Sequence, residues 1–268
     1  MYDRFNRRIH YLRVSVTDRC DLRCRYCMPA GGIVLKDRRE ILSYEDILRV
    51  VRVAAGLGID KVRLTGGEPL VRRGMVSLVE RMAGIPGIRE LCMTTNGVQL
   101  KGVARSLKQA GLDRLNISLD TLDREKYRHL TRVGDLDKVL AGVEAAREAG
   151  FQNTKINMVL IPGFNDDEIP RMKRFCSERG LVLQRINRYV LADINTRNRL
   201  LPAERPLDCS LCNRLRLLSD GRLKPCLFSD IEIPVDLGDI EGSIRRAVDS
   251  KPGQGSFNRT TQNWQIGG

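Results

Sequence analysis

The chain has 268 residues, 42% hydrophobic and 29% charged, a composition that excludes wholesale intrinsic disorder and allows a sizeable core. Its 46 basic and 33 acidic residues give a net charge of +13, which favours an anionic partner such as nucleic acid or a phosphorylated small molecule. No apolar run approaches the roughly 20 residues of a membrane span. The charged start, residues 1–10, does not resemble a signal peptide. A cytoplasmic protein with no membrane contact is therefore expected.

A β-then-α rhythm runs through the first two thirds of the chain. Residues 12–17 are predicted to form the opening strand, and five later β-rich segments each start at a glycine, at 58–65, 87–95, 111–119, 150–160 and 180–187. Helical spacing predicts helices at 43–55, 103–110 and 136–149, the first with Ser43 and Asp46 as a capping pair. Six successive βα units predict an α/β fold with a parallel sheet, either a barrel or a doubly wound sheet.

Unusual polar residues follow four of these predicted strands. They are the Thr-Gly-Gly-Glu-Pro run at 65–69, Thr-Thr-Asn-Gly at 94–97, Ser-Leu-Asp at 118–120, and Asn157. Any one of them could simply make a turn. Four together favour a barrel whose carboxyl-terminal rim gathers polar groups into one site.

Three cysteines, Cys20, Cys24 and Cys27, directly follow the opening strand with the spacing Cys-x₃-Cys-x₂-Cys. Without a secretory signal, clustered cysteines bind metal more often than they form disulfides. Three thiolates at this spacing suit a four-iron cluster that keeps one iron open to another ligand. The alternative, a zinc knuckle, lacks a fourth ligand nearby except His10.

A second group of cysteines, Cys209, Cys212 and Cys226, lies beyond the βα units. From spacing alone it is another three-thiolate site, and zinc with one distant ligand stays open there. Cys92 and Cys176 are interpreted as core residues. We expect a barrel domain over 1–190 and an extension over 191–268 that carries the second site. The final stretch, 251–268, lacks periodicity and is expected to be a tail.

The first cysteine motif, with the Gly66-Gly67-Glu68-Pro69 turn, resembles the radical S-adenosylmethionine (SAM) enzymes. The resemblance implies a partial (βα)₆ barrel resembling a TIM barrel, and a 4Fe-4S cluster on Cys20, Cys24 and Cys27 whose open iron SAM chelates. Cleavage of SAM would then give a 5′-deoxyadenosyl radical that abstracts a substrate hydrogen. By motif position, the residues implied to line SAM are Tyr26, Gly66, Gly67, Glu68, Ser118, Asn157 and Val190.

The second cysteine group, followed by Arg214 and Arg216, resembles that of the GTP 3′,8-cyclases of molybdenum-cofactor biosynthesis. This resemblance implies a second 4Fe-4S cluster on Cys209, Cys212 and Cys226 whose open iron contacts the guanine of GTP. The residues implied to bind the substrate are Arg13, Arg63, Thr94, Lys155, Arg185, Arg214 and Arg216. It also implies that the terminal Gly267 and Gly268 reach into the active site and serve the radical step.

The resemblance further implies partners: a reductant protein, a downstream cyclic pyranopterin monophosphate synthase, and a second copy in a homodimer. Two departures leave alternatives open. Only 23 residues separate Arg185 from Cys209, where the family carries a longer connection, and Arg188 stands where the family has an acidic residue. A radical SAM enzyme acting on another nucleotide or a peptide is one alternative. A metal-binding scaffold that docks on nucleic acid through its net charge is another.

Overall fold

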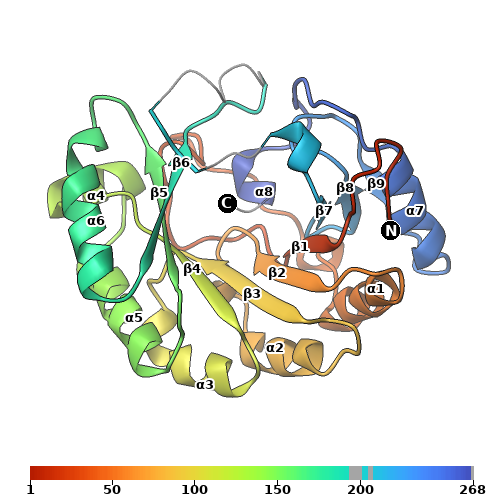
Figure 1. Cartoon of the computed structure of the whole chain (residues 1–268), viewed down its shortest axis with the longest axis horizontal. Helices are drawn as coiled ribbons and strands as arrows, with labels where there is room; N and C mark the ends of the chain where they lie inside the picture. Colours follow the sequence, from red (N-terminus) through yellow and green to blue (C-terminus); the bar gives the residue numbers. More distant parts are fainter. Residues whose placement is uncertain (193–200, 205–207, 267–268) are drawn as a thin grey trace.

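The structure, a computed structural model, describes residues 1–192, 201–204 and 208–266. Within these ranges nine strands form one curved sheet in the order β6-β5-β4-β3-β2-β1-β7-β8-β9 (Figure 1). The first six are parallel: β1 (Tyr11–Ser15), β2 (Lys61–Thr65), β3 (Glu90–Thr95), β4 (Arg114–Ser118), β5 (Lys155–Leu160) and β6 (Val182–Asn187). The predicted strands are present, and the expected α/β partial barrel is confirmed.

Helices cover the convex face of this sheet (Figure 1). They are α1 (Tyr44–Gly56), α2 (Met75–Ala83), α3 (Ala104–Gln109), α4 (Arg124–Thr131), α5 (Leu136–Glu148) and α6 (Ile169–Glu178). The predicted cap of α1 is confirmed, because the Ser43 hydroxyl accepts a hydrogen bond from the backbone N–H of Asp46 at 3.0 Å. Such a bond satisfies one of the amides that a helix leaves unpaired at its first turn.

The alternation of side chains along each strand separates the core from the hollow side of the sheet. On β1, Leu12 and Val14 are buried in the core with helix residues such as Ile47. Since successive strand residues point to opposite faces, the alternate residues Tyr11 and Arg13 face the hollow. The hollow side therefore receives the polar and charged half of each strand.

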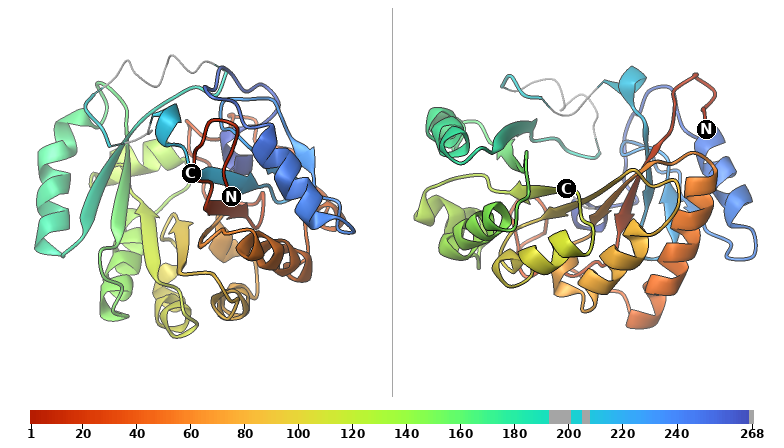
Figure 2. Two further views of the ribbon diagram at one scale, coloured as in Figure 1. Left: turned by 45° about the vertical axis from the view of Figure 1, so that its right-hand side comes forward. Right: turned by 60° about the horizontal axis from the view of Figure 1, so that its bottom comes forward.

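The extension continues the same sheet. Its elements are β7 (Arg214–Leu217), β8 (Arg222–Lys224), β9 (Ile233–Pro234), α7 (Ile240–Asp249) and α8 (Asn263–Ile266). Strand β7 pairs in parallel with β1, whereas β8 and β9 pair antiparallel beyond it. Helix α7 packs beside α1 and adds Ile244 and Val248 to the common core (Figure 2). The domain boundary at residue 190 stays a prediction, and the described part of the extension shares sheet and core with the barrel.

The stretch that was expected to be a tail, from residue 251, is packed against the rest of the protein in the described residues up to 266. Lys251, Asn258, Thr261 and Trp264 are all buried. The segment is held by polar contacts rather than by a periodic apolar face: the Asn258 side chain donates to the Leu227 carbonyl at 3.0 Å. Helix α8 then lies inside the hollow of the sheet (Figure 1). A search for hydrophobic periodicity misses a segment packed in this way.

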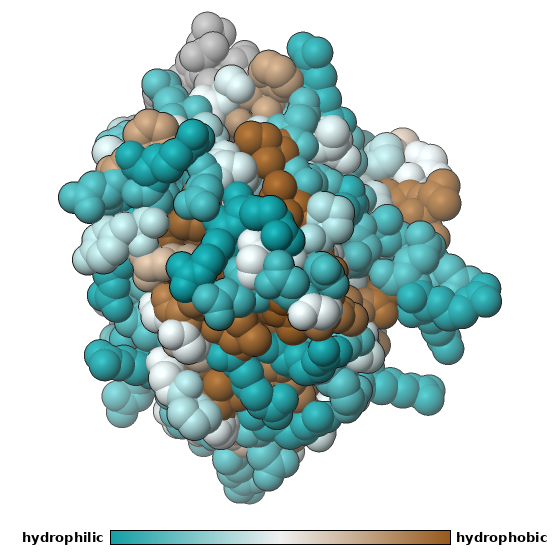
Figure 3. Space-filling view, turned by 90° about the vertical axis from the view of Figure 1, so that its right-hand side faces the viewer, coloured by the Kyte–Doolittle hydropathy of each residue, from teal (hydrophilic) through white to brown (hydrophobic). Residues whose placement is uncertain are grey.

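Figure 3 shows the face of the molecule on the side of α7, where hydrophilic residues cover most of the surface and apolar side chains show between them. Among all the described residues, no helix is long and apolar enough to cross a membrane.

Candidate functional site

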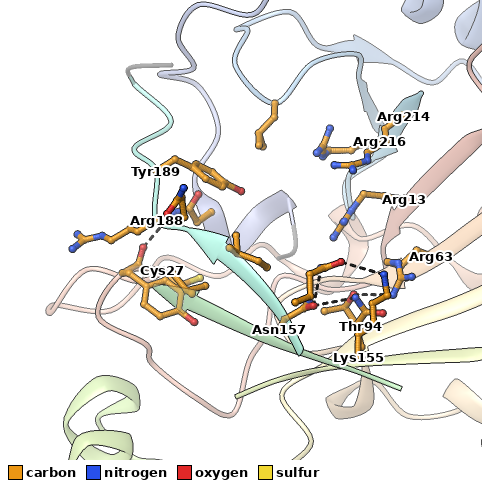
Figure 4. Close-up of a pocket in the computed structure, with 18 of the residues that line it drawn as sticks. Arg13, Cys27, Arg63, Thr94, Lys155, Asn157, Arg188, Tyr189, Arg214 and Arg216 are labelled. Atoms are coloured by element: carbon orange, nitrogen blue, oxygen red, sulfur yellow. Dashed lines mark hydrogen bonds between the residues drawn. The ribbon is translucent and has the colours of Figure 1, made fainter. Parts of the chain in front are cut away.

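A cavity of about 240 Å³ occupies the hollow side of the sheet (Figure 4). Strands β1 to β7, the loop of the first cysteines and α8 all contribute to its wall. The lining residues that the sequence had singled out are Arg13, Tyr26, Cys27, Arg63, Thr94, Lys155, Asn157, Arg188, Arg214 and Arg216. Lining residues that it had not singled out include Tyr11, Lys61, Asn116, Gln184, Tyr189, Leu227 and Asn263.

One wall of the cavity is an array of basic side chains set by strand register. Arg13 of β1 lies opposite Arg63 of β2 on one side and Arg216 of β7 on the other. Because side chains alternate every two residues, the row two residues earlier faces the same way. That row consists of Tyr11, Lys61 and Arg214, which are likewise in register. Figure 4 shows Arg13, Arg63, Arg214 and Arg216 gathered at this end.

These charges crowd one another. Burial, and then the charges of Arg216, Arg214 and Arg63, lower the pKa of Arg13 to about 9, although Tyr11 opposes them. The Arg63 Nε–H donates to the Tyr11 hydroxyl at 2.5 Å. The Nε of Arg216 is buried without a hydrogen-bond partner among the described residues. The lining residues that the structure describes include no carboxylate. A bound polyanion would relieve this repulsion and pair with the guanidinium groups.

The strands further along the sheet carry a network of polar side chains. The Asn157 side-chain oxygen accepts hydrogen bonds from Asn116 at 3.2 Å and from Gln184 at 2.9 Å. Lys155 donates to the Gln184 side-chain oxygen at 3.3 Å, and Arg63 donates to the Thr94 hydroxyl at 3.3 Å. The network orders amide and hydroxyl groups that can discriminate among polar ligands.

The first cysteine loop lies at the carboxyl end of β1. Cys20, Cys24 and Cys27 are half-buried, and Cys27 lines the cavity. Burial raises the pKa of Cys20 and of Cys27 to about 12, and that of Cys24 is also raised well above its usual value. Thiols in such surroundings become thiolates when a metal supplies positive charge.

The donor set of this loop fits a cluster better than a single ion. Among the described residues, no three His, Cys, Asp or Glu side chains are grouped so as to hold one metal ion. A four-iron cube is several ångströms across, so its thiolate ligands need not converge on one point. Three thiols in one loop, with one at the cavity wall, are the ligands that a 4Fe-4S cluster with an open iron requires.

The Gly66-Gly67 turn packs directly against the backbone that leads into the cysteine loop. A Cβ atom at Gly67 would lie 2.3 Å from the Arg19 carbonyl oxygen, and one at Gly66 would lie 2.7 Å from that of Thr17. The adjoining backbone hydrogen bonds run from Gly67 N–H to Thr17 and from Glu68 N–H to Arg19, both at 2.8 Å. Only glycine allows this approach, which fixes the start of the cysteine loop.

Glu68, the acidic residue of that turn, is fully enclosed by protein groups. Its carboxylate accepts hydrogen bonds from the Thr95 hydroxyl at 2.7 Å and from the backbone N–H groups of Asn96 at 2.6 Å and Leu70 at 3.0 Å. Burial raises the pKa of Glu68 to about 7 despite these bonds. The carboxylate therefore joins the turns after β2 and β3, and it is not among the residues that line the cavity.

Tyr26, between two cysteines of the first motif, connects that loop to β4 and β5. Its hydroxyl donates to Asp120 at 2.8 Å, and the other Asp120 oxygen accepts the N–H of Val159 at 2.7 Å. Burial raises the pKa of Asp120 to about 6. The side-chain amide of Asn263 in α8 donates to the Tyr26 carbonyl at 3.2 Å. The end of the described chain therefore contacts the cysteine loop.

The second cysteine group lies at the other side of the cavity. Cys209, Cys212 and Cys226 are half-buried, and the neighbouring Arg214 and Leu227 line the cavity. Burial raises the pKa of Cys212, but Lys251, the Arg214 amide and the charges of Arg216 and Arg214 outweigh it and lower that pKa to about 7. Three thiols in a cationic setting suit thiolate ligation, so this donor set also fits an iron–sulfur cluster.

Several residues predicted for the site lie outside the cavity wall. Arg185 points away from it and pairs with Glu204 at 2.6 Å, whereas its neighbours Gln184 and Ile186 line it. Val190 is 50% exposed, and Ser118 is not among the lining residues. Gly267 and Gly268 lie outside the described residues. Arg185 stands one position after the lining residue Gln184, and neighbouring residues on a strand face opposite sides.

Lys61 and Gln184 are two of the lining residues that sequence reasoning missed. Lys61 lies two positions before Arg63, so both side chains are on the same face of β2. Gln184 lies opposite Asn157, which also lines the cavity. The signal available for Lys61 was the two-residue period of its strand. For Gln184 nothing local distinguished it from Arg185.

The chain is similar to known proteins in both sequence and fold. The model of the Radical SAM superfamily matches residues 14–176. The chain is 44% identical to the GTP 3′,8-cyclase of Moorella thermoacetica over 288 positions, covering 91% of this chain and 88% of that relative. It is 43% identical to the GTP 3′,8-cyclase of Thermodesulfovibrio yellowstonii, covering 88% and 87%. The first alignment is longer than this chain, so that relative has positions with no counterpart here.

Among solved structures, the chain resembles Streptococcus suis SuiB bound to S-adenosylmethionine with a TM-score of 0.68. The sequence identity is 19%, and the match covers 91% of this chain and 64% of that chain. At this level of identity the likeness concerns the fold.

Proposed function

The chain belongs to the radical SAM superfamily and to its GTP 3′,8-cyclase family, and we propose that it acts as a lyase that converts GTP to (8S)-3′,8-cyclo-7,8-dihydroguanosine 5′-triphosphate in molybdenum-cofactor biosynthesis. The observation that carries this proposal is the register-set array of Arg13, Arg63 and Arg216 on the wall of a cavity that also contains Cys27. An array of guanidinium groups in which Arg63 and Arg216 are buried and Arg13 is half-buried, with no carboxylate among the described lining residues, suits a triphosphate.

The cationic wall would bind the triphosphate. Arg13, Arg63 and Arg216 form one row and Lys61 and Arg214 the next, so phosphate oxygens can be contacted from three strands at once. Each guanidinium offers paired donors at a fixed spacing, which matches phosphate geometry. Burial of the row strengthens each contact, because water screens it less.

The opposite end of the cavity would hold SAM beside the first cluster. Cys20, Cys24 and Cys27 would ligate this 4Fe-4S cluster, and Tyr26 and Asn157 would face the cofactor. Reduced cluster and SAM together supply the one-electron chemistry that starts hydrogen abstraction. The residues of the chain position that chemistry against the substrate and exclude water from it. Gly66, Gly67 and Glu68 would serve it by fixing the loop.

The second cysteine group would hold a second 4Fe-4S cluster at the guanine. Support comes from Leu227, which follows Cys226 directly and lines the cavity, so a ligand between the two cysteine groups would reach both. Gly267 and Gly268 follow α8, whose Asn263 lines the cavity. We therefore keep the proposal that the last two residues serve the radical step.

The proposed reaction also requires partners. An external reductant protein would deliver the electron, and a cyclic pyranopterin monophosphate synthase would consume the product. A homodimer remains an expectation from the family resemblance.

The test is anaerobic reconstitution with iron and sulfide, followed by addition of SAM, a strong reductant and GTP. We expect 5′-deoxyadenosine together with an isomer of GTP, both followed by chromatography and mass spectrometry. Arg185→Met serves as the control variant, because Arg185 pairs with Glu204 outside the cavity, and its product yield should match the parent. Absence of 5′-deoxyadenosine under all conditions would refute the proposed chemistry.

Parallel reactions separate the rival functions. 5′-Deoxyadenosine without conversion of GTP, but with conversion of ATP, ITP or a peptide, would support a radical SAM enzyme with another substrate. Salt-sensitive binding of nucleic acid without SAM cleavage would support the scaffold alternative.

Variants of the two cysteine groups are expected to lose different activities. Cys27→Ala should abolish SAM cleavage, because Cys27 belongs to the loop that would hold the first cluster. Cys226→Ala should lose the GTP product and retain some SAM cleavage. Equal product from the Cys226 variant and the parent would remove the role of the second group.

A further inference from the structure

A buried lysine, Lys251, lies against the second cysteine group. Lys251 is only 1% exposed. The ammonium donates to the Arg214 carbonyl at 2.9 Å and to the Pro225 carbonyl at 2.6 Å. Both carbonyls lie beside the cysteine group, because Arg214 stands two residues after Cys212 and Pro225 directly precedes Cys226. An ammonium has three donors, and two of them here reach the start of β7 and the residue before Cys226.

The charge of Lys251 has no carboxylate partner among the described residues. A second buried lysine, Lys224, shows the ordinary arrangement: it is fully buried, donates to the Ser229 carbonyl at 2.7 Å and pairs with Glu232 at 3.2 Å. Burial of an unpaired ammonium is costly unless another negative group compensates it. The cysteine group would supply that negative charge when it holds a cluster, because the carbonyls that Lys251 contacts belong to Arg214 and to the residue before Cys226.

The segment that begins at Lys251 also closes over the cysteine group. A Cβ atom at Gly255 would lie 3.0 Å from the Cys226 sulfur. Arg7, from the amino-terminal end, donates to the carbonyls of Cys209 at 2.9 Å and Gly253 at 3.0 Å. Arg7 is neutralised by Asp3 at 2.7 Å, so it fixes backbone without adding net charge. Lys251, by contrast, brings a positive charge without a carboxylate partner among the described residues to the backbone beside the cysteine group.

We propose that Lys251 is a positioning residue for the second iron–sulfur cluster: its ammonium holds the backbone beside Cys212 and Cys226, and its positive charge raises the reduction potential of the cluster. Hydrogen bonds and positive charge near ligand sulfurs stabilise the reduced, more negative state of such clusters. The inference rests on the second cluster of the proposed function, and it adds a residue outside both cysteine motifs.

The experiment uses the full chain carrying Cys20→Ala, Cys24→Ala and Cys27→Ala, so that any cluster present is held by the second group. Into this background we introduce Lys251→Met and Lys251→Gln, with Lys224→Met as the matched control. After anaerobic reconstitution, iron and sulfide contents are measured, and the reduction potential is followed by electron paramagnetic resonance during a redox titration.

We expect the Lys251→Gln variant, which keeps a polar head group without charge, to hold iron and to show a more negative potential than the background. The reduction potential of the Lys251→Met variant should be at least as negative. The Lys224→Met control should keep the potential of the background, because that lysine is paired with Glu232.

An unchanged potential in the Gln variant, or an equal shift in the Lys224 control, would overturn the assignment of Lys251. Absence of iron from the background itself would overturn both this inference and the second cluster. SAM cleavage by the protein with its first cysteine group intact tests the radical SAM function separately, so the two failures are distinguishable.

Discussion

Replacement of Arg216 by methionine tests the cationic wall most directly. Arg216 is 6% exposed, lies in register with Arg13, and has a buried Nε without a hydrogen-bond partner among the described residues. Methionine keeps much of the side-chain volume and removes the charge. If the wall binds a triphosphate, the variant should lose affinity for GTP without losing its fold.

The expected size of the loss follows from the number of contacts removed. A hydrogen bond to a charged group contributes about 1.5 to 3 kcal/mol. One lost guanidinium contact should therefore raise the Kd for GTP by between about tenfold and about a hundredfold. Without GTP, the melting temperature should stay the same or rise, because one of the charges that crowd Arg13 is gone.

The assay is calorimetric titration of GTP into the metal-free protein, with thermal unfolding measured in parallel with and without GTP. Stabilisation by a ligand depends on its concentration relative to Kd, so the GTP-induced rise in melting temperature should shrink in the variant. Arg185→Met is the control and should bind GTP like the parent, because Arg185 pairs with Glu204 outside the cavity. An unchanged Kd for the Arg216 variant, or equal losses in both variants, would refute the assignment of the wall.

Two further predictions concern the turn that supports the first cysteine loop. Gly67→Ala should destabilise the protein by about 1 to 3 kcal/mol in urea unfolding, because the new Cβ would lie 2.3 Å from the Arg19 carbonyl oxygen. The control Gly102→Ala should not destabilise it, because Gly102 has open space around it. Equal stabilities of the two variants would contradict the packing argument. Burial raises the pKa of Glu68 from 4.5 to about 7, so between these values the native protein holds a proton that the unfolded chain has released. The free energy of unfolding should therefore fall as pH rises through that window, and Glu68→Gln should flatten this slope in urea titrations of the metal-free protein; the same slope in both proteins would show that Glu68 is not its source.

Local patterns in the sequence were sufficient for the elements and for the cysteine groups. Glycine starts, apolar strand cores and helical spacing predicted six βα units, and the cap at Ser43 was read correctly. These signals are local, because a strand or helix start depends on residues a few positions apart. The spacing of Cys20, Cys24 and Cys27 likewise lies within one loop.

Local patterns could not predict which side chains of the sixth strand face the cavity. Residues 184–188 contain a single apolar residue, Ile186, among polar and charged ones, so no apolar face indicated which side chains point inward. The structure turns Gln184 toward Asn157 and leaves Arg185 with Glu204. Packing against neighbouring strands decided this, and a shift of one residue reverses the outcome.

By itself, the sequence determined the α/β class, the order of the strands and helices, and the two sets of thiols. Only the tertiary structure decided that β7 pairs with β1, which sets Arg216 beside Arg13 across some two hundred intervening residues. It also decided that the segment after Lys251 packs over the second cysteine group. The physical reason is that strand pairing and the burial of charged groups depend on contacts between distant parts of the chain, which no local period encodes.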